Sequence, residues 1–117
     1  MGETMKKTVN YKEIGEKIRN EREIFEMSRE KFAELLNLSP FFVGQIERGE
    51  RKMSIGTLIN VSECLHVSID YLIFGEKRND KEYDKLHSLI SKCSKTEANV
   101  IEEIITIILP HIARWRL

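Results

Sequence analysis

The stretch from Met27 to Gly49, MSREKFAELLNLSPFFVGQIERG, constrains the fold most, because it predicts two short helices joined by a tight turn. The first helix is expected over residues 28–36, with the initial serine as its N-cap. Asn37 marks the reversal of the chain, since asparagine tolerates the left-handed backbone conformation better than any residue except glycine. Ser39 and Pro40 then begin a second helix, because serine caps free amides and proline at the first helical position loses no hydrogen bond.

The second of these helices has one buried and one exposed face. Val43 and Ile46 are three residues apart and are expected to point into the core. Two short helices joined by so short a turn form a helix-turn-helix motif, in which the second helix enters the major groove of DNA. The residues left on its outward face are Phe41, Gly44, Gln45 and Arg48.

The chain resembles the lambda-repressor-like (Cro/XRE) helix-turn-helix family of transcriptional regulators over about residues 14–75. The segment IGEKIR at 14–19, followed by Arg22, is similar to the first helix of that family. The IERG sequence at 46–49 matches the I-E-x-G ending of its recognition helix, and VSIDYL at 67–72 is similar to its closing helix. The resemblance implies an all-α fold, with a five-helix DNA-binding domain.

The resemblance also indicates which residues contact double-stranded DNA. Gln45 is expected to contact a base edge, because glutamine can bond adenine through two hydrogen bonds. Phe41 is expected either to contact a thymine methyl group or to pack on its neighbour. Arg29 stands where the family usually has glutamine, which favours a phosphate contact over a base contact. The complete set of expected DNA-binding residues is Ser28, Arg29, Ser39, Phe41, Phe42, Gly44, Gln45, Arg48, Arg51 and Lys52.

Two further residues are expected to hold the recognition helix rather than to touch DNA. In the family that this chain resembles, the glutamate of I-E-x-G pairs with an arginine near the end of the first helix. Glu47 and Arg22 occupy those positions. Arginine suits the role because its planar guanidinium binds a carboxylate through two hydrogen bonds.

The C-terminal part of the chain predicts two amphipathic helices after a charged linker at residues 76–80. We expect a flexible tail at 1–10, the DNA-binding domain at 11–75 and a helical dimerisation segment at 81–117, with Pro110 bending or ending the last helix. This order of parts is similar to that of SinR-type regulators. The residues expected in a homodimer interface are Leu86, Ile90, Val100, Ile101, Ile104, Ile105, Ile108, Ile112 and Trp115. Packing of this segment on the DNA-binding domain, or a membrane role, are the alternatives.

Composition argues against several other classes of protein. The 19 basic and 19 acidic residues balance, so only a local basic patch is available for nucleic acid. Cys64 and Cys93 are expected as reduced, buried thiols, and no Cys/His spacing typical of a metal site is present. We therefore expect no metal or cofactor and no enzymatic centre. The longest apolar run, 104–109, is too short to cross a membrane, and a cytoplasmic, nucleoid-associated protein is expected.

The sequence thus predicts a sequence-specific DNA-binding transcriptional regulator, a repressor that binds an inverted-repeat operator as a homodimer. Two alternatives stay open. One is an antitoxin that represses its own operon while its C-terminal segment masks a toxin. The other is a protein-interaction module that uses the C-terminal helices to sequester a related regulator or an antagonist.

Overall fold

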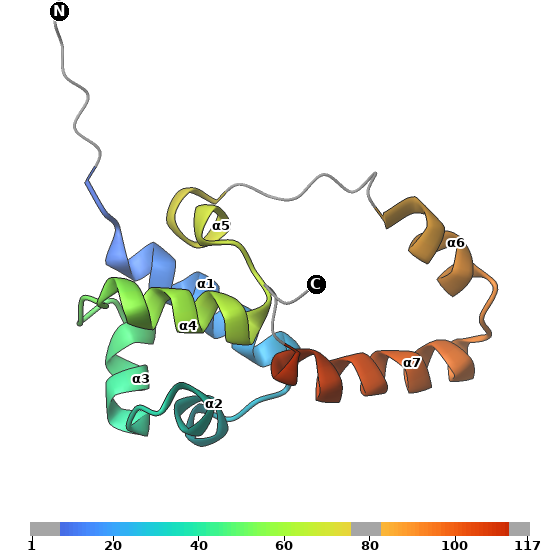
Figure 1. The fold of residues 1–117 in the computed structure, drawn as a ribbon, viewed down its shortest axis with the longest axis horizontal. Helices are drawn as coiled ribbons and strands as arrows, with labels where there is room; N and C mark the ends of the chain where they lie inside the picture. Colours follow the sequence, from blue (N-terminus) through green and yellow to red (C-terminus); the bar gives the residue numbers. More distant parts are fainter. Residues whose placement is uncertain (1–7, 76–82, 113–117) are drawn as a thin grey trace, which may run out of the picture.

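The computed structural model describes residues 8–75 and 83–112, and these residues form helices with no β-strand among them. The expectation of an all-α fold is confirmed. A first group of five helices is followed by a helical hairpin (Figure 1). The elements are α1 Tyr11–Ile24, α2 Arg29–Leu36, α3 Pro40–Glu47, α4 Ile55–Leu65, α5 Ile69–Phe74, α6 Asp84–Ser91, α7 Lys95–Ile108 and the short 3-10 helix η2 Leu109–His111.

Serine side chains fix where most of these helices begin. In α2, α3, α4, α5 and α7 the serine directly before the helix accepts a hydrogen bond from the backbone amide three residues later. Ser94 and Glu97 form a reciprocal capping box at the start of α7. Because each cap satisfies an amide that would otherwise lack a partner, the helix starts follow from the local sequence.

The turns between helices use left-handed residues at the expected places. Asn37 ends α2 with φ of 57°, and its backbone amide bonds back to the helix. His66 ends α4 with φ of 54°, at a position where a glycine would carry no steric penalty. A third left-handed residue, Glu26 with φ of 55°, lies between α1 and α2 and was not expected from the sequence.

The hydrophobic core lies among the first five helices. Each helix contributes at least one side chain that is almost completely buried. The most deeply buried large side chains are Ile18 of α1, Phe32 of α2, Val43 of α3, Val61 and Leu65 of α4, and Leu72 of α5. Ala33, the small residue of α2, is also buried, which lets neighbouring helices approach closely.

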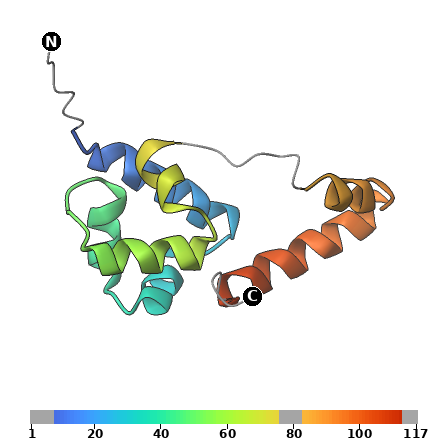
Figure 2. The ribbon, with the colours of Figure 1, turned by 45° about the horizontal axis from the view of Figure 1, so that its top comes forward.

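The α6–α7 hairpin projects away from this core (Figure 2). Among the described residues that follow α5, Leu109 of η2 is the one that packs against the core, and η2 lies against α4. Ile112, which we expected in the dimer interface together with Ile104, lies outside α7. The α-helix ends at Ile108, and Ile112 has an extended backbone with φ of −96° and ψ of 124°. Pro110 explains the ending, because it lacks the amide needed to continue an α-helix.

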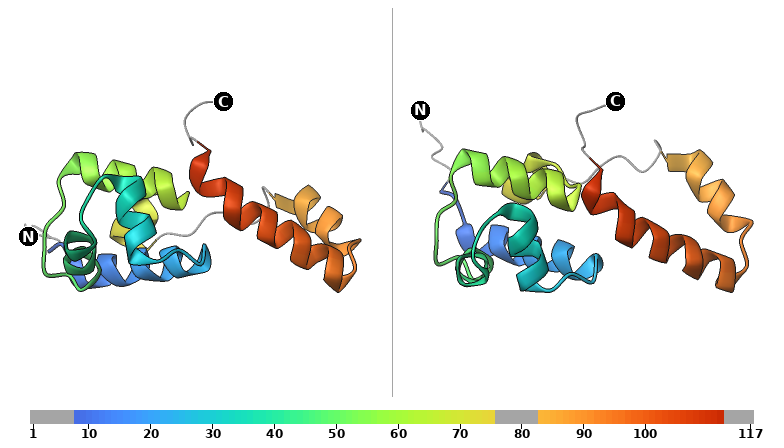
Figure 3. Two further views of the ribbon diagram at one scale, coloured as in Figure 1. Left: turned by 90° about the horizontal axis from the view of Figure 1, so that it is seen from below. Right: turned by 60° about the horizontal axis from the view of Figure 1, so that its bottom comes forward.

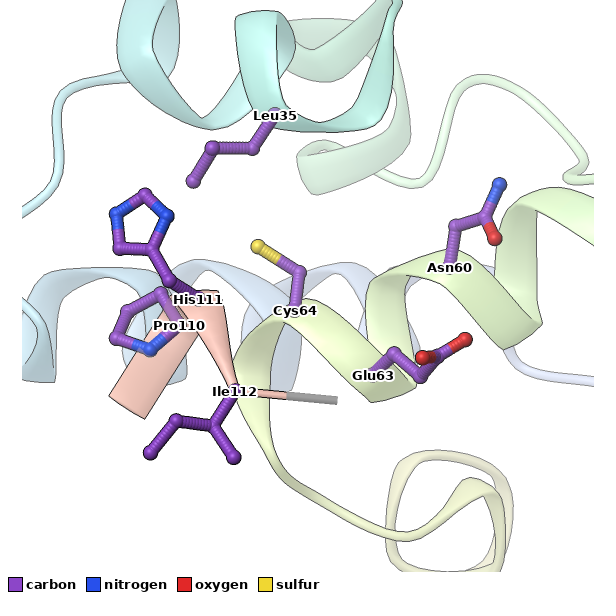
Figure 4. Close-up of a pocket in the computed structure, with 7 residues that line it drawn as sticks. All are labelled: Leu35, Asn60, Glu63, Cys64, Pro110, His111 and Ile112. Atoms are coloured by element: carbon purple, nitrogen blue, oxygen red, sulfur yellow. The ribbon is translucent and has the colours of Figure 1, made fainter. Parts of the chain in front are cut away.

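A cavity of about 270 Å³ lies where the end of the hairpin meets the first five helices. Figure 4 shows Cys64 of α4 with Leu35 of α2 above it and Pro110 and His111 of η2 to its left. Cys64 is buried, as expected, whereas Cys93 is only partly buried because it lies beyond the end of α6. The N-terminal residues 1–7, the linker 76–80 and Trp115 fall outside the described residues.

Candidate nucleic-acid interface

Helix α3 has one face packed against the core and another face exposed to solvent. Val43 and Ile46 are 1% and 3% exposed and fix the helix to the core. Phe41 is 71% exposed, and Gln45 is partly exposed. The helix lies at the end of the molecule remote from the α6–α7 hairpin (Figures 1 and 3). A helix anchored on one face and free on the other has the geometry needed to enter a groove.

One residue of the expected outward face is covered by a neighbouring side chain. Gly44 is buried in the structure. A Cβ atom at that position would lie 3.0 Å from Nη1 of Arg48, whose side chain covers the glycine. Arg48 is itself held by Glu50, with Nε 3.1 Å from a carboxylate oxygen. The side chains of α3 that remain available to bases are therefore Phe41 and Gln45, with Arg48 at the end of the helix.

Arg22 of α1 and Glu47 of α3 are joined through two hydrogen bonds. Nε of Arg22 donates to Oε2 at 2.7 Å, and Nη2 donates to Oε1 at 3.1 Å. The side chains are 8% and 1% exposed. The hydrogen bond to Glu47 raises the pKa of Arg22, while burial acts in the opposite direction. This is the pair that the sequence resemblance implied, and it ties the end of α3 to α1.

Arg29, which we expected at a DNA phosphate, also contacts Glu47. Its Nε donates to Oε1 at 3.1 Å, so one carboxylate accepts hydrogen bonds from two arginines. Sequence reasoning missed this contact. The available signal was an arginine in place of the usual glutamine, since arginine brings a charge that a nearby carboxylate can bind.

The two basic residues of the loop after α3 rest on aromatic rings. The guanidinium of Arg51 lies 5.1 Å from the centre of the Phe42 ring, and Nζ of Lys52 lies 5.9 Å from that of Tyr11. Both basic side chains are exposed. A cation held over a ring keeps most of its donors free. Phe42 thus supports a basic side chain, in addition to its partial burial.

The hydroxyl groups of Ser28 and Ser39 are engaged in capping. Each accepts a hydrogen bond from a backbone amide of its own helix, Lys31 at 3.0 Å and Phe42 at 3.1 Å. Both serines are exposed at the positive end of a helix dipole, where an anion is favoured. The expected DNA-binding residues therefore gather around α3, the start of α2 and the loop after α3.

Two other features are absent from the part of the chain that the structure describes. No group of three or more His, Cys, Asp or Glu side chains there is arranged to hold a metal ion. None of the helices described is both long and apolar enough to cross a lipid bilayer.

Comparison with known proteins gives consistent matches. A model of the helix-turn-helix family matches residues 18–72, which ends before α6. Control protein C.SmaI from Serratia marcescens is 35% identical over 60 residues, covering 51% of this chain and 71% of that protein.

Two solved structures are each similar to about half of this chain. One is the restriction-modification controller protein C.AhdI from Aeromonas hydrophila, with 27% identity and a TM-score of 0.51. The other is the P22 c2 repressor in complex with a synthetic operator, with 28% identity and a TM-score of 0.52. In both cases 54% of this chain and 96% of the other chain are covered.

Proposed function

The chain belongs to the helix-turn-helix family of DNA-binding transcription regulators, and we propose that it is a repressor that binds an inverted-repeat operator as a homodimer. Similarity to a restriction-modification controller and to an operator-bound repressor supports regulation through operator binding. The proposal assigns DNA binding to residues 11–75 and dimerisation to residues 81–117, with a linker at 76–80. It places the protein in the cytoplasm, at the nucleoid.

The observation that carries this proposal is the anchoring of α3. Buried Val43, Ile46 and Glu47 fix one side of the helix, while Phe41 and Gln45 stay accessible on the other. A rigid scaffold with accessible side chains is what base readout in a major groove requires. We assign Gln45 to a base edge and Phe41 to a thymine methyl group. Arg29, Arg48, Arg51 and Lys52 are assigned to phosphates, which position the protein without reading sequence.

The homodimer is supported by the apolar surface of the hairpin. Side chains of α6 and α7 that a solvated helix would not display are between 37% and 52% exposed: Leu86, Leu89, Ile90, Val100, Ile101, Ile104, Ile105 and Ile108. Large apolar side chains that are left exposed along a helix in this way mark a protein–protein contact. Two copies related by a twofold axis would bind half-sites about 34 Å apart in successive major grooves.

The test begins by selecting bound fragments from genomic DNA and examining them for an inverted repeat. Binding of the selected operator should weaken steeply with salt, because several phosphates are neutralised. Gln45→Ala should cost about 1–3 kcal/mol and relax preference at one base pair of each half-site. Lys52→Ala is the matched control and should weaken binding to all sequences alike. Equal losses on every sequence for both variants would contradict the assigned role of Gln45.

The same exposed apolar surface favours a second candidate function. The exposed apolar side chains of the hairpin also fit a different protein, either a toxin masked by an antitoxin-type autorepressor or a related regulator that is sequestered. Sedimentation of the purified protein separates these candidates from the homodimer. A monomer at tens of micromolar that binds a co-purified partner through α7 would favour the heterologous complex.

A further inference from the structure

The carboxylate of Glu47 is shared between two arginines, which leaves the cluster with one excess positive charge. Oε2 accepts from Nε of Arg22, and Oε1 accepts from both Nη2 of Arg22 and Nε of Arg29. Nη1 of Arg22 donates to the backbone oxygen of Met27 at 2.6 Å. The carboxylate thus accepts three hydrogen bonds at a site where its side chain is 1% exposed. A single glutamate cannot neutralise both guanidinium groups.

The excess charge is accessible on Arg29. Its side chain is 39% exposed, whereas that of Arg22 is 8% exposed. A guanidinium has five N–H donors, and within residues 8–75 and 83–112 only the Nε donor of Arg29 has a hydrogen-bond acceptor. Arg29 is also the first residue of α2, where the helix dipole adds positive potential. Its two terminal nitrogens are therefore free to bind an anion beside the accessible face of α3.

We propose that Arg29 is a positioning residue that determines specificity: it binds a DNA phosphate through Nη1 and Nη2 while Nε keeps its hydrogen bond to Glu47. This inference rests on the proposed operator binding. Glu47 is the last residue of α3 and lies two positions after Gln45. A phosphate held by Arg29 therefore fixes the recognition helix relative to the DNA backbone. The phosphate contact therefore determines how deeply α3 enters the major groove and which base pair Gln45 contacts.

The double contact requires arginine. A guanidinium can present its Nε–H to a carboxylate on one edge and its terminal N–H groups to a phosphate on the other. Lysine keeps the charge but concentrates its donors at one point, and glutamine has a single uncharged amide group. Arg29→Lys therefore keeps the electrostatic attraction to DNA and removes the Nε donor that bonds Glu47 apart from the phosphate-facing nitrogens. Arg29→Gln removes both.

The experiment measures affinity of the full chain for the selected operator and for a scrambled duplex of the same length and composition, at several salt concentrations. Arg29→Lys should lower the ratio of the two affinities about tenfold, with little change in the salt dependence. Lys52→Gln is the control, since Lys52 has no contact with Glu47. It should lower both affinities by a similar factor, reduce the salt slope by about one, and leave the ratio unchanged.

Three outcomes separate this inference from the function on which it rests. If Arg29→Lys keeps the parental ratio while the parent binds its operator selectively, Arg29 acts only as a charge and the inference is overturned alone. If the parent binds the operator and the scrambled duplex equally well, the proposed function is wrong, and the inference that rests on it is wrong too. A ratio lowered by Arg29→Lys, with helical content and melting temperature close to those of the parent, supports the inference.

Nuclear magnetic resonance of the arginine side chains supplies a second measurement that does not depend on affinity. The Arg29 Nε–H signal should be protected from solvent exchange in the free protein and stay protected when operator DNA is added. The chemical shift of this Nε–H signal should change in the Glu47→Gln variant, because an amide oxygen accepts the hydrogen bond more weakly than a carboxylate does. Loss of protection on DNA binding would show that Arg29 releases Glu47 to reach the phosphate, and that would overturn the proposed double contact.

Discussion

Gly15 of α1 lies directly against the backbone of Glu47 at the end of α3. A Cβ atom at position 15 would lie 2.5 Å from the carbonyl oxygen of Glu47 and would also collide with that of Ile46. Backbone atoms cannot move aside as a flexible side chain can, so the two helices cross at this distance only with glycine. The orientation of the recognition helix depends on this contact as well as on the ion pair to Arg22.

Gly15→Ala should therefore destabilise the protein by about 1–3 kcal/mol, because the added methyl group forces α1 and α3 apart. This loss exceeds the gain of up to ~1 kcal/mol that alanine brings in a helix. Gly56→Ala in α4 is the matched control. The nearest heavy atom to its Cβ would be Oγ of Ser54 at 3.9 Å, so this variant should be neutral or slightly stabilising. Urea unfolding measures the free energy of unfolding of both variants. If Gly15→Ala were as stable as Gly56→Ala, α3 would be able to shift without cost.

Glu47→Ala should reduce the free energy of unfolding by about 3–5 kcal/mol, because it leaves the buried Arg22 without its carboxylate. Replacing both residues with methionine should recover much of the loss, since neither charge is then buried. Glu23→Ala is the control: its ion pair with Arg19 joins two half-exposed side chains and should contribute less than ~1 kcal/mol. Thermal melts compare the variants. A Glu47→Ala melt equal to that of the parent would contradict the structural role of the pair.

Cys64 should resist alkylation at pH 8 while Cys93 reacts, because burial raises the pKa of the Cys64 thiol to about 11. Only about one thiol in a thousand is then ionised at that pH. Cys93 is partly exposed and serves as the internal control. Mass spectrometry after timed iodoacetamide treatment measures both rates. Equal labelling would show that the cavity beside η2 opens readily.

The same raised pKa predicts how stability changes at alkaline pH. The folded value of about 11 lies above the ordinary value of 9.0, so folding favours the protonated thiol. The stabilisation is present below pH 9 and is lost as the pH rises through 11, by roughly 3 kcal/mol in total. Cys64→Ala lacks this loss, so the stability difference between parent and variant should narrow from pH 8 to pH 10. A constant difference would contradict the raised pKa.

The helix boundaries were predictable from sequence because their causes are local. Serines before α2 and α3 and proline at the start of α3 act within one turn of the chain. Asn37 likewise adopts its left-handed conformation through its own chemistry. Glu26 adopts the same conformation without a residue type that signals it, so the turn before α2 was not foreseen.

Contacts around the recognition helix were predictable only where the family resemblance supplied them. Arg22 and Glu47 could be paired on that basis. The bond from Arg29 to Glu47 joins residues 18 apart and depends on how α2 crosses α3, which no local pattern specifies. Burial of Gly44 under Arg48 has a different cause, since it depends on the rotamer of a side chain four residues further along the chain. The hairpin showed its apolar character in the sequence, but its contact with α4 through η2 arises from tertiary packing.

Ile104→Glu should convert the protein to a monomer that keeps its helical content. Ile104 lies in the exposed apolar face of α7 and is 49% exposed. In a twofold contact a charge placed there appears twice, close to its own copy and away from water. Asn99→Glu is the matched control, because position 99 is exposed on the opposite, polar face of the same helix. Sedimentation at micromolar concentrations should show a dimer for the control and a monomer for Ile104→Glu.

Loss of the dimer should also weaken operator binding. Each half-site would then be bound independently, and affinity should fall by roughly 100-fold or more. Asn99→Glu should bind operator as the parent does, apart from a small effect of its added negative charge. A parent protein that sediments as a monomer at tens of micromolar would contradict the homodimer. In that case the apolar face of α7 would serve a different partner, and the sequestration function would become the better account of the hairpin.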